Sequence, residues 1–355
     1  MKKALALLLT MVLTLGLGLT ALAESTYEIA MITDIGTIDD KSFNQGTWEG
    51  VKAYADANSK TCNYFKPAEK STNAYLAEID KAVAAGAKVI VTPGFLFEEP
   101  IFIAQKTYPD VHFVLIDGNP HNADYTEFRT DSNTVGIVFA EEQAGYLAGY
   151  AAVKDGYTKL GFMGGMAVPA VVRYGYGFVQ GAEAAATELG VTGLTMNYHY
   201  TGNFEANPEN QAVAASWYND GVEVIFACGG AVGNSVMAAA EATEKGKVIG
   251  VDVDQSSESD RVITSAMKGL GNAVEQALTA FYADKFPAGE AWVLGADKNG
   301  VGLPMATSKF EKFTQADYDA LYAKLAAGEI TLKKDTDVTA ATELGTTAVT
   351  VTIIE

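Results

Sequence analysis

A repeating order of strand and helix constrains this chain more than any other feature of its sequence. Short runs rich in β-branched residues are each followed by a turn and then by an amphipathic stretch of helix length. Gly86, Gly190 and Gly246 stand where such helices end, and glycine readily adopts the left-handed conformation of a helix C-terminus. Strands that alternate with helices form parallel sheets with covered faces, so we predict an α/β fold. The expected strands are 27–33, 62–66, 88–92, 111–117, 160–164, 194–200, 222–227 and 248–253.

The length of the chain and the breaks in this rhythm predict two lobes. A chain of 355 residues exceeds what one hydrophobic core usually serves. The strand–helix order pauses around 119–134 and again after Asp254, where we expect the chain to pass between two doubly wound parallel sheets joined by a hinge. Two such sheets side by side place a cleft at the carboxyl ends of their strands. The expected parts are 24–132 with 254–285 for the N-terminal lobe, 133–253 with 286–334 for the C-terminal lobe, and 335–355 for a C-terminal extension.

The last third of the chain departs from the rhythm. One more strand and helix are expected over 261–285, a β-ribbon over 291–306 and a last helix over 314–330. The tail from Asp335 is rich in threonine and valine, and we expect it either to add a strand or to remain apart from the sheets.

The N-terminus has the order of a secretory signal peptide. The cationic start "MKK" is followed by an apolar run, and "ALA" at 21–23 supplies the small residues of a cleavage site. The alternative is a membrane-spanning helix of about 20 residues. We expect residues 1–23 to be a signal peptide and the protein to be exported. Since no cysteine precedes Cys62, we expect no lipid anchor and a periplasmic, cell-surface or extracellular location.

Charge and cysteine content exclude some partners. The net charge is −19, and nucleic acids and anionic membranes both require a positive surface, so we expect neither as a partner. The two cysteines, Cys62 and Cys228, lie in strand-like runs far apart in the sequence. Whether they form a disulfide depends on a distance that the sequence does not give.

Residues able to hold a ligand follow the expected strands. In doubly wound sheets a ligand contacts the loops at the carboxyl ends of the strands. Polar, aromatic and glycine residues gather in those loops instead of being spread along the chain. They are Asp34, Phe43, Asn44, Asp117, Tyr174, Gly229, Gly230, Asp252 and Lys268.

Each of these residues also has a purely structural interpretation. Ser42 or Asp40 can cap the helix that follows, and Phe43 can pack on that same helix. Asp117 can bond loop amides, the glycines can serve a turn, and Tyr174 can belong to a core.

Six segments of this sequence resemble the basic membrane protein family of substrate-binding proteins, also called the purine-nucleoside receptor type. The resemblance covers residues 27–332, and its most specific motif is the first. In chain order the motifs are "DIGTIDDKSFNQGTWEG", "GFMGG", "VIFACGGAVGNSV", "VIGVDVDQS", "VITSAMKG" and "LYAKLAAGEITL". The resemblance implies a type I periplasmic-binding-protein fold, a nucleoside held between two lobes, and delivery to an ABC permease. Members of the family usually carry a lipid-anchoring cysteine that this chain lacks.

The resemblance also implies roles for single residues. Phe43 and Tyr174 would sandwich the base, and Asp252 would accept two ribose hydroxyl groups with assistance from Lys268. Other residues would contact the base, hold the loop or let the backbone approach the ligand: Asp34, Asn44, Asp117, Gly229 and Gly230. Acidic cavity walls favour a nucleoside over a nucleotide. We expect a monomer without a cofactor or metal.

Two other classes of function remain as alternatives. An enzyme is not expected, because none of His112, His121 and His199 sits at a loop cluster with a serine or cysteine, and no nucleophile, zinc or phosphate-loop motif occurs. The same fold can instead bind a sugar, an amino acid or another small signal molecule, or act as a sensor that presents its ligand to a receptor.

Overall fold

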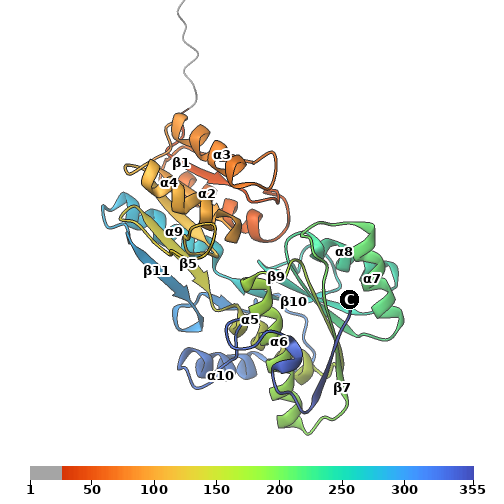
Figure 1. The fold of residues 1–355 in the computed structure, drawn as a ribbon. Coiled ribbons are helices and arrows are strands. Elements are labelled where there is room, and N and C mark those ends of the chain that lie inside the picture. Colours follow the sequence, from red (N-terminus) through yellow and green to blue (C-terminus); the bar gives the residue numbers. More distant parts are fainter. Residues whose placement is uncertain (1–25) are drawn as a thin grey trace, which may run out of the picture.

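The computed structural model describes residues 26–355, and the expected signal peptide lies outside this range. Within it, the chain forms two lobes, each built on a mainly parallel sheet with helices on both faces (Figure 1). The predicted α/β class with two doubly wound sheets is confirmed. No described helix is long and apolar enough to cross a membrane.

The described part of the first lobe is a six-stranded sheet in the order β11-β5-β4-β3-β1-β2. Helices α2 (Phe43–Ala57) and α9 (Leu270–Tyr282) cover one face, and α3 (Thr72–Ala84) and α4 (Glu98–Thr107) cover the other. Its strands are β1 (Ile29–Ile32), β2 (Cys62–Phe65), β3 (Val89–Pro93), β4 (His112–Ile116), β5 (Thr134–Phe139) and β11 (Glu290–Leu294).

The second lobe has a described sheet of seven strands in the order β12-β10-β9-β8-β6-β7-β13. Helices α5 (Glu141–Asp155) and α6 (Pro169–Leu189) lie on one face, and α7 (Pro208–Asn219) and α8 (Val232–Ala242) on the other. Helix α10 (Gln315–Ala326) packs near α5. The strands are β6 (Lys159–Gly164), β7 (Leu194–Tyr200), β8 (Val224–Cys228), β9 (Lys247–Asp252), β10 (Val262–Lys268), β12 (Val301–Gly302) and β13 (Val349–Ile353).

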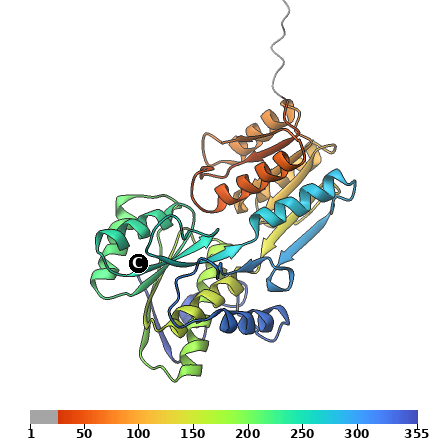
Figure 2. The ribbon, with the colours of Figure 1, turned by 180° about the vertical axis from the view of Figure 1, so that it is seen from behind.

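The two sheets repeat one topology. The first five strands of each lobe pair in the same order, β2-β1-β3-β4-β5 and β7-β6-β8-β9-β10. After its fifth strand, however, each lobe sends the chain to the other: α5 follows β5 but packs on β10, while α9 follows β10 but packs beside α2. Figure 2 shows α9 and β11 lying with the N-terminal lobe although they come late in the chain.

Strand pairing corrects the expected lobe boundaries. β5 and β11 pair with each other in the first sheet, although both fall in ranges expected for the C-terminal lobe. β10 pairs with β9 in the second sheet, although it falls in the range expected for the N-terminal lobe. The expected β-ribbon is wrong, because β11 and β12 belong to different sheets. The tail does add a strand: β13 pairs in parallel with β7.

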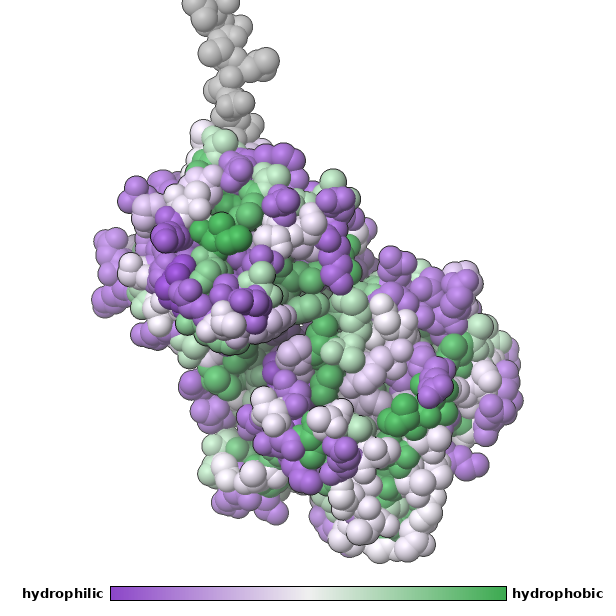
Figure 3. All heavy atoms as spheres, in the orientation of Figure 1, coloured by the Kyte–Doolittle hydropathy of each residue, from purple (hydrophilic) through white to green (hydrophobic). Residues whose placement is uncertain are grey.

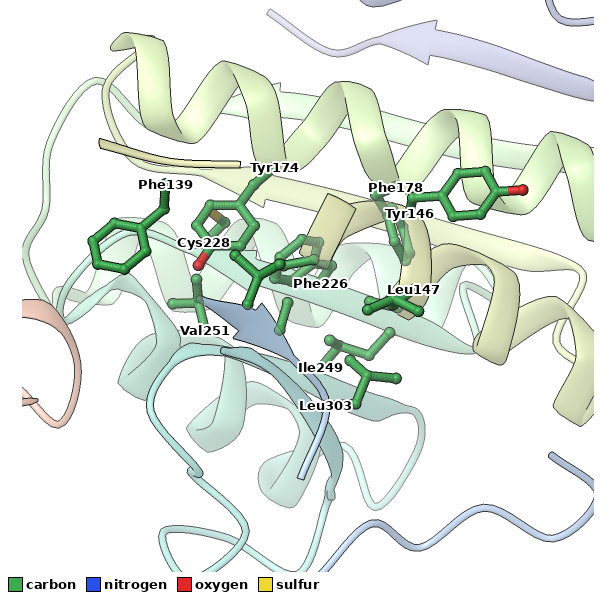
Figure 4. Packing of buried hydrophobic residues seen from close by; sticks show 14 of the residues in the cluster. Phe139, Tyr146, Leu147, Tyr174, Phe178, Phe226, Cys228, Ile249, Val251 and Leu303 are labelled. Carbon is green, nitrogen blue, oxygen red and sulfur yellow. The ribbon is translucent and has the colours of Figure 1, made fainter. Parts of the chain in front are cut away.

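The central strands are apolar throughout because both of their faces are covered. In β1, Ile29 and Met31 belong to the core beneath α2, while Ala30 and Ile32 belong to the core beneath α3 and α4. In the second lobe, Phe226 of β8 lies between Tyr174 and Phe178 of α6, with ring centroids 5.8 and 5.3 Å away (Figure 4).

Helices α5 and α6 approach each other closely because glycines line their contact. Gly145 and Gly149 lie one turn apart on α5, and Gly177 and Gly181 lie one turn apart on α6. A Cβ atom at any of the four would lie 2.0–2.1 Å from a carbonyl oxygen of the other helix. This contact fixes where the first turns of both helices lie, beside the cavity described next.

The cysteines are both free. Cys62 lies in β2 and Cys228 at the end of β8, and these strands belong to different sheets. The question of a disulfide is therefore settled in favour of two thiols.

Candidate functional site

A cavity of about 360 Å³ lies between the lobes at the carboxyl ends of both sheets. In Figure 3 the lobes meet along a seam where apolar residues come to the surface, while hydrophilic residues cover much of the outer face. All nine residues singled out in the sequence line this one cavity: Asp34, Phe43, Asn44, Asp117, Tyr174, Gly229, Gly230, Asp252 and Lys268.

The loop after β1 is held by a carboxylate that caps α2. Asp40 Oδ1 accepts hydrogen bonds from the backbone N–H groups of Ser42 (2.9 Å) and Gln45 (3.1 Å), and Oδ2 accepts one from Asn44 N (3.0 Å). Of the two expected capping residues, Asp40 therefore fills the role, and the side chain of Ser42 is free to bond elsewhere. The cap places Phe43, the first residue of α2, at the cavity.

Asn44 links two acids of this loop. Its amide group donates to Asp34 Oδ1 and to Asp40 Oδ2, each at 3.0 Å. Asp34 Oδ1 also accepts from the N–H group of Gly36 at 2.7 Å. Burial of Asp34 outweighs these bonds and raises the pKa of its carboxyl group from 3.8 to about 6.

The repeated topology places similar residues at matching strand ends. The third strands, β3 and β8, are each followed by a glycine with positive φ, Gly94 (110°) and Gly229 (141°). The fourth strands, β4 and β9, lead to aspartates in the left-handed region, Asp117 (φ 60°) and Asp252 (φ 67°). Aspartate is one of the few non-glycine residues that adopts this conformation readily. The two lobes therefore turn a buried carboxylate into the cavity at matching positions.

Lys268, at the end of β10, joins these two carboxylates. Its ammonium group is hydrogen-bonded to Asp117 of the first lobe and lies 3.7 Å from Asp252 Oδ1 of the second. Glu141, which does not line the cavity, lies 3.4 Å from the same nitrogen. Lys268 is the one basic side chain among the described residues that line the cavity.

Burial and charge act in opposite directions in this cluster. Burial would lower the pKa of Lys268, but Asp117, Glu141 and Asp252 outweigh it and raise that pKa, so the ammonium group stays charged. Burial raises the pKa of Asp117 to about 7, although Lys268 opposes the rise. Burial also raises the pKa of Asp252, against the effects of Lys268 and Ser42.

Three aromatic rings of the cavity differ in exposure. Phe43 and Phe204 are half-buried and come from opposite lobes. Tyr174 is only 1% exposed, packs on Phe226 and leaves its buried hydroxyl group without a hydrogen-bond partner. Lys268 Nζ lies 4.6 Å from the centroid of the Phe43 ring, a cation–π distance.

Phe204 is one of the cavity residues that the sequence analysis did not single out. It lies in the loop after β7, and glycines leave space for it: a Cβ atom on Gly165 or Gly229 would lie 2.3 or 3.0 Å from its ring. The signal was available, because Phe204 follows an expected strand just as Phe43 does. The same holds for Phe95 after β3, another lining residue.

Direct contacts join the lobes around the cavity. Ser42 Oγ donates to Asp252 Oδ2 at 2.5 Å, and Gln255 Nε2 donates to the carbonyl oxygen of Lys41 at 2.7 Å. Lys41 Nζ lies 3.6 Å from Glu258, although both side chains are substantially exposed and the pair contributes little. Among the described residues, no group of three or more His, Cys, Asp or Glu side chains is arranged to hold a metal ion.

Comparison with protein families and curated proteins gives a consistent result. A family model named Bmp and described as "ABC transporter substrate-binding protein PnrA-like" matches residues 27–336. The "ABC transporter nucleoside-binding protein BmpA" of Lactococcus lactis subsp. cremoris is 29% identical over 316 residues, covering 83% of this chain and 86% of that protein. "Basic membrane protein A" of Borreliella burgdorferi is 31% identical over 260 residues, covering 72% and 73%.

Solved structures agree on the fold. An ABC transporter solute-binding protein from Aeropyrum pernix K1 superimposes with a TM-score of 0.74 at 23% identity, covering 86% of this chain and 93% of that chain. The expected type I periplasmic-binding-protein fold is confirmed.

Proposed function

The chain belongs to the Bmp family of ABC transporter substrate-binding proteins, and on this premise we propose that its interlobe cavity binds a nucleoside, preferably a purine nucleoside. One observation carries the proposal: a single cavity holds aromatic rings and buried carboxylates from both lobes. A flat base matches the rings, and the adjacent hydroxyl groups of a ribose match an ionised carboxylate. The related protein of Lactococcus lactis is named as a nucleoside-binding protein, which supports the same ligand class.

The base would lie between Phe43 and Phe204. These rings are half-buried and belong to opposite lobes, whereas the ring of Tyr174 is covered by its own core. We therefore replace Tyr174 by Phe204 as the second ring of the sandwich and assign the tyrosine hydroxyl group to a polar contact at the cavity floor. Each stacked ring contributes about 0.5–1.5 kcal/mol beyond the area it buries. Asp34 and Asn44 would bond the polar edge of the base.

The ribose would bind at Asp252. Its Oδ2 accepts from Ser42, while Oδ1 lies 3.7 Å from Lys268 and can accept from sugar hydroxyl groups. Hydrogen bonds to charged groups contribute about 1.5–3 kcal/mol each. Asp34, Asp40, Asp117, Asp252 and Glu205 line the cavity against one lysine, so a phosphate group would be repelled. We therefore expect a nucleoside rather than a nucleotide.

Variants of the rings and of the ribose acid test these assignments. Phe43→Ala, Phe204→Ala and Asp252→Asn should each weaken binding of inosine or guanosine about tenfold or more, because each removes about 1.4 kcal/mol or more. Tyr125→Ala is the matched aromatic control, because Tyr125 is 64% exposed and lies outside the cavity. Isothermal titration calorimetry measures the affinities. Unchanged affinity in folded Phe43 and Asp252 variants would contradict the proposal.

The wider role follows from the family. We propose that the protein is exported and delivers its ligand to an ABC permease, as a binder and not as an enzyme. Incubation with inosine or adenosine should leave the nucleoside intact, and release of free base would instead indicate a hydrolase. A sugar ligand remains the second candidate, because sugar sites also combine aromatic rings with carboxylates.

A further inference from the structure

Behind Lys268 lies a second layer of charged residues that does not line the cavity. Glu141 is fully buried at the start of α5, and its Oε1 lies 3.4 Å from Lys268 Nζ. Its other oxygen, Oε2, accepts a hydrogen bond from Arg173 Nε of α6 at 2.6 Å. Arg173 Nη1 in turn lies 3.5 Å from Asp335, in the C-terminal segment. A continuous row of alternating charges therefore runs from the cavity to the tail.

We propose that Glu141 and Arg173 are positioning residues for the ligand site, and that Asp335 couples the C-terminal segment to it through Arg173. The proposal rests on the proposed function, since the site that these residues would adjust is the nucleoside site. None of the three residues lines the cavity, so each would act on a ligand only through Lys268.

The position of the Lys268 ammonium group decides whether Asp252 is available to bind a ribose hydroxyl group. Lys268 is shared by Asp117, Asp252 and Glu141, which match the three hydrogens of an ammonium group. The negative charge of Glu141 attracts the ammonium group away from the cavity. Without that charge, the ammonium group would pair more closely with Asp117 and Asp252. A ribose hydroxyl group would then compete with Lys268 for Asp252 Oδ1.

The structure keeps Glu141 charged and fixed. Burial would raise the pKa of Glu141, but Arg173 and Lys268 overcome it and lower that pKa. The positive end of the α5 dipole also favours a carboxylate in the first turn. The glycine contact between α5 and α6 brings Arg173 within hydrogen-bond distance of Glu141.

The tail is anchored at this same point. Lys334 Nζ lies 3.1 Å from Glu142, the neighbour of Glu141. The side-chain amide of Gln180 of α6 donates to the carbonyl oxygen of Lys333 (2.9 Å) and accepts from its backbone N–H group (2.8 Å). Residues 333, 334 and 335 therefore bind Gln180, Glu142 and Arg173 in turn, on helices α6, α5 and α6. Because Asp335 and Glu141 bind the same guanidinium group, a change in the tail reaches Lys268 through three successive ion pairs: Asp335–Arg173, Arg173–Glu141 and Glu141–Lys268.

A double-mutant cycle measured by titration calorimetry with inosine tests the coupling. Glu141→Gln and Arg173→Gln should each weaken binding about tenfold, and Asp335→Asn about threefold. In the Glu141→Gln background, Arg173→Gln should have no further effect, because Arg173 acts through Glu141. Glu188→Gln is the control: Lys154–Glu188 is also a pair between α5 and α6 (2.8 Å) but lies at the far end of both helices. Additive losses in the double variant, or equal losses in the control, would overturn the proposal.

A ligand-free measurement keeps the proposal testable whatever the wild-type protein binds. Asp117 is faced by Lys268, Glu141 and Asp252, and the charge of Glu141 helps to raise the pKa of Asp117 to about 7. Carboxyl-carbon NMR of the ligand-free protein should therefore show Asp117 titrating at lower pH in Glu141→Gln and unchanged in Glu188→Gln. An unchanged midpoint in Glu141→Gln would refute the positioning role.

Absence of nucleoside binding by the wild type would refute only the proposed function. If Glu141→Gln does not fold, Arg173→Gln and the partly exposed Asp335→Asn provide the same two readouts.

Discussion

At the scale of the residue, the site consists of carboxylates whose ionisation is unfavourable without a partner. Asp117 and Asp252 occupy matching strand ends in two lobes of the same topology, and both bind Lys268. The sequence predicted that these residues would meet, because carboxyl ends of parallel strands converge at one edge of a sheet. It did not predict the ion pairs or the role of Glu141, and it left the buried position of Tyr174 as one of two alternatives, since each depends on packing between segments far apart in the chain.

Asp34 should make the ligand-free protein less stable as the pH rises. Its pKa in the folded state is about 6 against an ordinary value of 3.8, so the folded state binds the proton more tightly than the unfolded state. The stability gained from protonation is complete below the ordinary pKa and is lost as the pH rises through about 6. Asp34→Asn has no such loss. Between about pH 4 and pH 7, its free energy of unfolding should therefore rise by about 1–3 kcal/mol relative to that of the wild type.

Urea unfolding of both proteins across this pH range measures the difference. Asp39→Asn is the control, because Asp39 is exposed and a hydrogen bond from Thr37 lowers its pKa instead. A constant difference between Asp34→Asn and the wild type would show that Asp34 does not have a raised pKa.

At the scale of the element, strands were easier to predict than their partners. The eight strands expected from β-branched runs all occur near their predicted positions. β5 was missed: its run, 134–139, comes where the rhythm pauses, and its sheet is decided by pairing with β4 and β11. The lobe boundaries failed for the same reason, because a crossover between sheets leaves no local pattern in the sequence.

The contact between α5 and α6 should not tolerate a side chain. A Cβ atom on Gly177 would lie 2.0 Å from the carbonyl oxygen of Glu142, so Gly177→Ala has to push the helices apart. We expect a loss of about 1–3 kcal/mol or more in the free energy of unfolding, with weaker ligand binding because Arg173 moves with α6.

Gly271→Ala is the matched control in helix α9. The nearest neighbour of a Cβ atom there is Gly50 Cα at 3.8 Å, an ordinary van der Waals contact. This variant should be neutral or more stable by about 0.4–1 kcal/mol, because alanine restricts the unfolded chain. Equal stability of the two variants in urea unfolding would show that α5 and α6 are not in such close contact.

At the scale of the whole molecule, three crossovers link the lobes within residues 26–355: between β5 and α5, between β10 and α9, and between β11 and β12. They are bonded to one another, since Ala140 N donates to Leu294 O (3.1 Å) and Gly269 N to Gly300 O (2.8 Å). Such a bundle of short connections is a hinge, and Lys41 and Ser42 of the first lobe also contact the second lobe through hydrogen bonds with Gln255 and Asp252. A ligand between the lobes would therefore be enclosed by rotation about this bundle.

The central claim is that the enclosed ligand is a nucleoside, and a thermal-shift panel tests it most directly. The protein is unfolded and refolded to remove carried ligand, then melted with purine and pyrimidine nucleosides, free bases, nucleotides, pentoses, hexoses and amino acids. A ligand at about 100 times its dissociation constant adds about 2.7 kcal/mol, which raises the melting temperature measurably. We predict a rise in melting temperature with guanosine, inosine or adenosine and none with nucleotides or sugars. A rise with sugars or amino acids alone would leave the fold assignment intact. It would contradict the assignment of a nucleoside as the ligand and the roles proposed for Phe43, Phe204 and Asp252.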